Sequence, residues 1–88
     1  MLHEDLVEFF HFYNVTINTL VQIEHVNGNI VIAKIADPKV YYKLDKNGQF
    51  INSCIKLVGP DYNPKLTLNS NIINLLTDEL KSIKILSR

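Results

Sequence analysis

Apolar and polar residues alternate through the middle of the chain, with a period that indicates β-strands. The alternation predicts four consecutive antiparallel strands within residues 15–58, at about residues 15–26, 29–36, 39–45 and 49–58. Asn27-Gly28 and Asn47-Gly48 separate the strands of two hairpins. Asn-Gly is the strongest short hairpin signal, because both residues tolerate a positive φ. We therefore expect a positive φ at both glycines.

Two registers compete in the first hairpin. A two-residue turn places Ile23 opposite Ile32, whereas a three-residue loop over residues 27–29 places Ile23 opposite Ala33. We prefer the second register, because it gathers the following apolar residues on one face: Ile17, Val21, Ile23, Val31, Ala33 and Ile35. The other face then holds Leu20, Val26, Ile30 and Ile32. That face is too apolar for water, so we expect the N-terminal helix or another subunit to cover it.

The second hairpin follows a proline. Asp37-Pro38 predicts a break between the second and third strands, because proline cannot continue a central ladder. The turn at Asn47-Gly48 then predicts three cross-strand pairs, which are Leu44 with Ile51, Tyr42 with Ser53 and Val40 with Ile55.

A helical period appears towards both ends of the chain. Its first instance, Leu2, Leu6, Phe9, Phe10 and Tyr13, predicts an amphipathic helix over about residues 2–13, which Asn14 ends in a left-handed conformation. After a loop at residues 59–68, the apolar residues Ile72, Ile73, Leu76 and Leu80 predict a second helix over about residues 70–81. A short apolar run then predicts a final strand at residues 83–87. We expect residues 1–88 to form a single domain.

Composition narrows the class of protein. Nine basic residues balance nine acidic ones, so no global field draws the chain to phosphate or to a membrane. The single cysteine, Cys54, excludes an internal disulfide framework, and acidic residues stand near the N-terminus where a signal peptide needs basic ones. No apolar run approaches the ~20 residues of a membrane span. We expect a cytoplasmic protein without membrane association.

Catalytic and metal-binding motifs are not apparent. His3 and His11 are eight residues apart on the predicted helix, too far to share one ion, and Glu8 with His11 supplies only a pair of ligands. Cys54 and Ser53 lack neighbours in sequence that would activate a nucleophile. We therefore expect no catalytic residue, no metal, no cofactor and no enzymatic activity.

Tyrosines and lysines are interleaved in two stretches. Tyr41, Tyr42 and Tyr62 stand near Lys39, Lys43 and Lys65. Aromatic rings next to lysines can stack bases and hold phosphates. The competing and commoner interpretation is that strand tyrosines cover a sheet edge, in keeping with the β-propensity of tyrosine.

A helix that leads into a bent antiparallel meander resembles the Sm-like fold of the Sm, LSm and Hfq proteins. The first family motif matches at Val21, Ile23 and His25 before Gly28, and at Val31, Ala33 and Ile35 after it. The last residues, 82–88, are similar to the strand that closes the family's barrel. The resemblance implies a mainly β fold, a small Sm-like or SH3-like barrel of about five antiparallel strands. An N-terminal helix precedes it, and an extra helix precedes the last strand.

The resemblance also implies a function. Family members join the edges of their fourth and fifth strands into rings and hold bases in loop pockets. It implies a homo-oligomer of about five to seven copies that binds single-stranded RNA. The implied RNA-binding residues are Asp37, Lys39, Tyr41, Tyr62, Asn63 and Lys65. The alternative is a protein-interaction adaptor or inhibitor, of the kind found in phages or mobile elements, that binds no nucleic acid.

Overall fold

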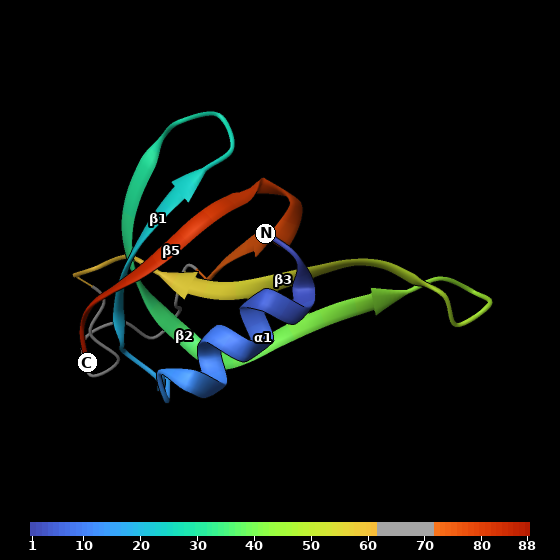
Figure 1. The fold of residues 1–88 in the computed structure, drawn as a ribbon, viewed down its shortest axis with the longest axis horizontal. Helices are drawn as coiled ribbons and strands as arrows, with labels where there is room; N and C mark the ends of the chain where they lie inside the picture. Colours follow the sequence, from blue (N-terminus) through green and yellow to red (C-terminus); the bar gives the residue numbers. More distant parts are fainter. Residues whose placement is uncertain (62–71) are drawn as a thin grey trace.

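Five antiparallel strands form one sheet in the computed structural model, which describes residues 1–61 and 72–88, and an α-helix precedes them (Figure 1). The elements are α1 (His3–Phe12), β1 (Leu20–His25), β2 (Ile30–Leu44), β3 (Phe50–Val58), β4 (Ile73–Leu76), the 3-10 helix η1 (Thr77–Glu79) and β5 (Leu80–Ser87). The strand order is β4-β3-β2-β1-β5. The prediction of a mainly β chain with an N-terminal helix is confirmed.

Helix α1 covers one face of the sheet. Leu6 and Phe10, one turn apart, are its buried residues, and Glu4 and Asp5 occupy the first turn, where the helix dipole favours negative charge. Asn14 has a φ of 50°, so the predicted left-handed residue does end the helix.

The predicted start of the first strand, at residue 15, is wrong. Asn18 has a φ of 72°, which interrupts any extended path from Val15, and β1 begins at Leu20. Thr19, just before the strand, is fully buried, and its hydroxyl accepts a hydrogen bond of 3.1 Å from the backbone N–H of Thr16. A turn fixed by side chains therefore replaces the predicted first part of the strand.

The core is shared between α1 and the sheet. Its buried apolar residues are Leu6, Phe10, Val15, Val21, Ile23, Ala33, Ile35, Val40, Ile55, Leu57, Leu75 and Leu80. Every strand contributes at least one of these side chains, so the core depends on the whole sheet and on the helix.

Both predicted registers of the first hairpin are wrong. Ile23 lies opposite Val31 and Val21 opposite Ala33, because the three-residue loop spans Val26 to Gly28, one position earlier than predicted. The preferred register and the observed one differ by two residues, which preserves the face that each side chain occupies. Val21, Ile23, Ala33 and Ile35 are accordingly buried together, whereas Ile17 and Val31 are exposed.

Strand β2 continues through Pro38, so the predicted strand break is wrong. Asp37 pairs with Lys56, and Tyr41 pairs with Cys54. These two pairs are four residues apart along β2 but only two residues apart along β3, so β2 contains two extra residues between them. Strand β1 pairs with β2 only as far as Lys34, so Pro38 lies in a bulge beyond that ladder. Proline is tolerated at such a bulge because no ladder hydrogen bond is needed there.

Beyond the bulge, β2 and β3 project from the body as a two-stranded ribbon (Figure 1). We call residues 42–52 the arm. Its predicted pair Tyr42 and Ser53 is confirmed, but Leu44 lies opposite Phe50 instead of Ile51, and Val40 falls in the bulge instead of pairing with Ile55. The molecule accordingly measures 41 Å along its long axis, against 27 and 26 Å across it.

The tip of the arm is closed by its own side chains. The carboxylate of Asp45 accepts hydrogen bonds from the backbone N–H groups of Asn47 and Gln49, at 2.8 and 2.9 Å. Gly48 has a φ of 77° and Gly28 a φ of 93°, as predicted for both turns.

The predicted second helix over residues 70–81 is wrong within the part of it that the structure describes. Residues 72–81 contain β4, η1 and the start of β5. Leu75 and Thr77 are buried and Leu76 is exposed, which is the two-residue period of a strand. The predicted final strand, residues 83–87, is confirmed as part of β5. Of the predicted loop at residues 59–68, only residues 59–61 are described, and they follow the end of β3.

A search of residues 1–61 and 72–88 for membrane-crossing helices finds none of sufficient length and apolar character.

We expect Gly28→Val to lower the free energy of unfolding by roughly 1–2 kcal/mol, because a β-branched residue is strained at positive φ. Gly28→Asn is the matched control, since asparagine tolerates this region, and it should cost clearly less. Thermal and urea unfolding measure both. Equal costs for the two variants would contradict the turn geometry.

Candidate functional site at the β2 bulge

The bulge of β2 brings three of the predicted RNA-binding residues together. The Tyr41 hydroxyl donates a hydrogen bond to the carboxylate of Asp37. The ammonium group of Lys39 lies 5.2 Å from the centroid of the Tyr41 ring. These contacts arise because the two extra residues fold Tyr41 back towards Asp37.

Lys56 is a fourth member, which the sequence analysis missed. Its ammonium group lies 4.5 Å from the centroid of the Tyr41 ring. It comes from β3, where it is the cross-strand partner of Asp37. The predicted pair of Val40 with Ile55 already places Lys56 opposite Lys39 and on the face of Tyr41, but the sequence analysis did not single it out. The bulge makes Asp37 the partner of Lys56 instead. Pro38 inside an otherwise regular strand pattern was the available signal for the bulge, because proline within sheets marks bulges.

The four residues form a compact polar cluster, which we call the Tyr41 cluster: Asp37, Lys39, Tyr41 and Lys56. Two ammonium groups and one carboxylate surround a half-buried ring, so the cluster carries one net positive charge at neutral pH. Cations attracted to an aromatic face hold the ring in place, and they also offer donors to an incoming anion. The arrangement suits binding of a ligand that combines a planar ring with a negative charge.

The hydrogen bond to Asp37 raises the pKa of Tyr41 above its ordinary value of 10.0, and the negative charge of Asp37 acts in the same direction. The neutral phenol is therefore favoured in the folded state. The stabilisation that the Tyr41–Asp37 contact adds to the folded state is fully present below pH 10. It is lost as the pH rises through the folded-state pKa of Tyr41.

The other three predicted RNA-binding residues, Tyr62, Asn63 and Lys65, lie outside the described residues. Their relation to the Tyr41 cluster stays a prediction.

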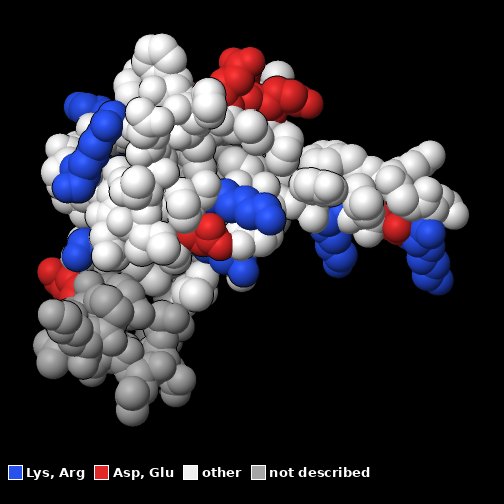
Figure 2. All heavy atoms as spheres, turned by 90° about the horizontal axis from the view of Figure 1, so that it is seen from below, with Lys and Arg blue, Asp and Glu red and all other residues white. Residues whose placement is uncertain are grey.

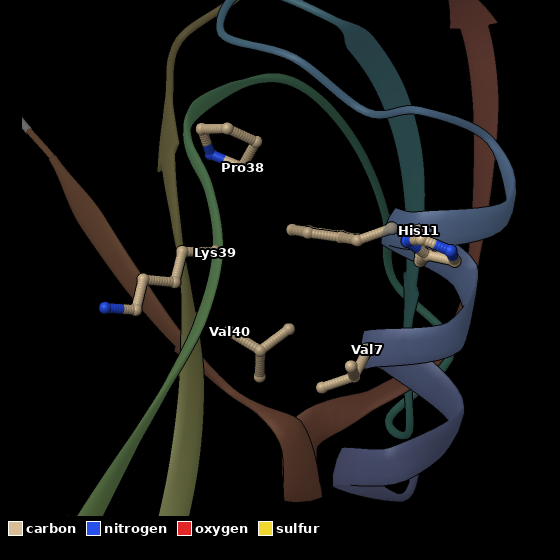
Figure 3. A pocket seen from close by; sticks show the side chains of 6 residues that line it. Val7, His11, Pro38, Lys39 and Val40 are labelled. Atoms are coloured by element: carbon tan, nitrogen blue, oxygen red, sulfur yellow. The ribbon is translucent and has the colours of Figure 1, made fainter.

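A groove of about 300 Å³ adjoins the cluster between α1 and β2 (Figure 3). Its lining residues are Val7, Phe10, His11, Pro38, Lys39 and Val40. Figure 3 shows the Lys39 side chain directed away from the groove. Its ammonium group is the one that lies 5.2 Å from the centroid of the Tyr41 ring. The groove is therefore mainly apolar, and Lys39 connects its rim to the Tyr41 cluster.

His3 marks a second feature, where the start of α1 meets the arm. Its ring makes edge contacts with Tyr42 and Phe50, at centroid distances of 6.0 and 5.9 Å. Its Nδ1 atom is buried and has no hydrogen-bond partner among the described residues. His3 is thus the contact through which the start of α1 supports the arm.

No group of three histidine, cysteine, aspartate or glutamate side chains gathers in residues 1–61 and 72–88 in a way that could hold a metal ion. His3 and His11, both on α1, contribute to different surfaces, the arm and the α1–β2 groove.

Comparisons of the chain with protein-family models, with curated proteins and with solved structures give no match. The geometry of the Tyr41 cluster and the surfaces that the sheet leaves open are therefore the features that bear on function.

We expect part of the phenolate absorbance, that of Tyr41, to appear above the ordinary tyrosine pKa of 10.0. Asp37→Ala should bring that transition down towards the ordinary pKa, because it removes both the hydrogen bond and the negative charge. Tyr41→Phe should remove the late transition altogether. A phenolate absorbance with no component above the ordinary pKa in the unmodified protein would contradict the Tyr41–Asp37 contact.

Proposed function

We propose that this chain is an Sm-like small-barrel protein that assembles into a homo-oligomeric ring of about five to seven copies and binds single-stranded RNA. The observation that carries the proposal is the strand order β4-β3-β2-β1-β5, which leaves β4 and β5 as the two edges of the sheet. An unpaired strand edge presents free N–H and C=O groups to another chain. Joining β4 of one copy to β5 of the next satisfies both edges.

Two further elements support the family assignment. Helix α1 precedes the sheet, and the short η1 stands directly before β5, in the place where Sm-like proteins have a short helical turn before their closing strand.

Apolar surface on the first hairpin supports self-association. Val26 and Ile30 are 62% and 61% exposed, and Ile32 is exposed as well. Helix α1 does not cover them, because its Leu6 and Phe10 pack into the core. Contiguous apolar surface of this kind marks an interaction site.

The RNA part of the proposal rests on the Tyr41 cluster. Its ring can stack on a base, and its two lysines can meet phosphates. A formal net charge of zero limits long-range attraction, so affinity should depend on stacking and hydrogen bonds and should fall less steeply with salt than for a basic protein. A ring repeats each weak site, which raises the overall affinity.

A second candidate function is that of a protein-interaction adaptor or inhibitor. The arm favours it, because this projecting ribbon exposes apolar side chains. The oligomeric state separates the two functions, since an adaptor needs no second copy of itself.

We expect light scattering at tens of micromolar protein to give about five to seven times the chain mass of 10.1 kDa. Ile73→Lys, at an exposed position of the β4 edge, should reduce the assembly to smaller species, because lysine on an edge strand opposes pairing. A monomer from the unmodified chain would remove the ring.

We expect Tyr41→Ala to weaken binding of a uridine-rich or adenine-rich oligonucleotide by roughly one to two orders of magnitude in an anisotropy titration, because a stacking ring is lost. Tyr41→Phe keeps the ring and should retain most of the affinity. Tyr13→Ala, which removes an exposed ring outside the Tyr41 cluster and the arm, is the matched control. Tyr42→Ala tests the other side of β2, because consecutive strand residues point to opposite faces.

If the unmodified chain binds neither oligonucleotide below ~100 μM, RNA binding is excluded and the adaptor function is favoured. If Tyr42→Ala weakens binding and Tyr41→Ala does not, the RNA lies on the opposite face of β2.

A further inference from the structure

The arm is a two-stranded ribbon whose outer edges have no strand beside them among the described residues. Strand β1 pairs with β2 only as far as Lys34, and β4 pairs with β3 only from Cys54 onwards. An isolated two-stranded ribbon is marginally stable in water and needs packing against something else. Within residues 1–61 and 72–88, the ring of His3 contacts Tyr42 and Phe50, and Phe50 also lines a pocket with Leu2 and Asp78. The arm keeps large exposed apolar surface in spite of these contacts.

Four large apolar side chains cover this ribbon and are each at least 46% exposed: Tyr42, Leu44, Phe50 and Ile51. Such residues, grouped on one projecting element, mark a surface that is buried in a complex.

The arm also carries positive charge. Lys43 and Lys46 are exposed, and Asp45 between them is engaged in the turn. Neither lysine forms an ion pair within the described part of the chain. The ion pair observed there joins Lys81 and Glu24. Figure 2 shows the lysines on the arm, directed away from the acidic side chains on the body.

The outer face of α1 is complementary to the arm. Glu4, Asp5 and Glu8 are exposed there, and none pairs with a basic residue in the described ranges. Val7 and Phe12 on the same helix are 43% and 76% exposed. The helix therefore offers unpaired negative charge beside apolar surface, which is the combination that matches the arm.

We propose that the arm of one copy docks on the outer face of α1 of a second copy. The inference rests on the proposed self-association and names a contact that edge pairing of β4 and β5 does not supply. The formal net charge of zero lets copies approach without overall repulsion. Because the contact joins two different surfaces, it is heterologous, and a heterologous contact repeats around a closed ring.

Charge reversal tests the contact in the full chain. Lys43→Glu with Lys46→Glu makes the arm acidic, and Glu4→Lys with Asp5→Lys makes the helix basic. Each double variant should raise the dissociation constant of the assembly at least about tenfold in sedimentation, because like charges then meet. The fourfold variant, which carries all four changes and again has zero formal net charge, should return to within about threefold of the unmodified protein.

A matched control separates this contact from the effect of overall charge. Arg88→Glu changes the charge by as much as Lys46→Glu does, at a position beyond the end of β5 and away from the arm (Figure 1). Combined with Glu4→Lys, each of these changes restores zero formal net charge, but only Lys46→Glu should restore assembly. Ile51→Ser, at an exposed arm position, should weaken assembly without changing the far-ultraviolet circular dichroism spectrum of the chain.

The outcomes distinguish this inference from the proposed ring. An unmodified chain that stays monomeric overturns both and leaves the arm to a different protein. An assembly that is unchanged by reversal of the arm overturns the arm contact alone. If the fourfold variant restores assembly and Ile73→Lys has no effect, the arm contact stands and the edge-paired ring fails.

Discussion

The insertion of two residues into β2, between Asp37 and Tyr41, is the constraint on which the rest of the structure depends. Before the insertion, Ala33 and Ile35 face the core beneath α1. After it, the same strand leaves the body and becomes one side of the arm. Pro38 keeps the free-energy cost of this change in strand direction low. It has no backbone N–H that would be left without a partner where the hydrogen bonds between β2 and β3 are interrupted. One irregularity thus separates a packed half of the sheet from an open half.

The chain divides its apolar residues between these halves. A chain of 88 residues buries a modest core, here built from α1 and the inner parts of all five strands. Large apolar side chains remain on the first hairpin, on the arm and along α1, with Val26, Tyr42 and Phe12 as examples. Burial of such surfaces against another chain would add the hydrophobic stabilisation that a small core cannot supply.

Local signals predicted the parts of the fold that depend on local chemistry. The helical period of Leu6 and Phe10 located α1, and the two Asn-Gly pairs located both hairpins with their positive φ values. The face of Val21 was also predictable, because a register error of two residues leaves it unchanged.

The rest depended on tertiary structure. Pro38 was interpreted as a strand break, since the sequence does not show that the β1 ladder ends before it. The apolar spacing after residue 71 fits a helix as well as a strand, and only the burial of Leu75 and Thr77 decides between them. Of the candidate site, Asp37, Lys39 and Tyr41 were predictable from one short stretch. Lys56 was missed, although the predicted pair of Val40 with Ile55 placed it on the face of Tyr41; its pairing with Asp37 follows from the bulge.

The closed tip of the arm has a consequence for the thermodynamics of recognition. Asp45 binds two backbone N–H groups of its own turn, so the loop is already ordered before it meets a partner. A segment that folds only on binding loses conformational entropy at that moment, which lowers affinity for a given contact area. A preformed tip avoids much of that loss. Association through it should then show a heat-capacity change set by the apolar area that is buried, without the larger signature of coupled folding.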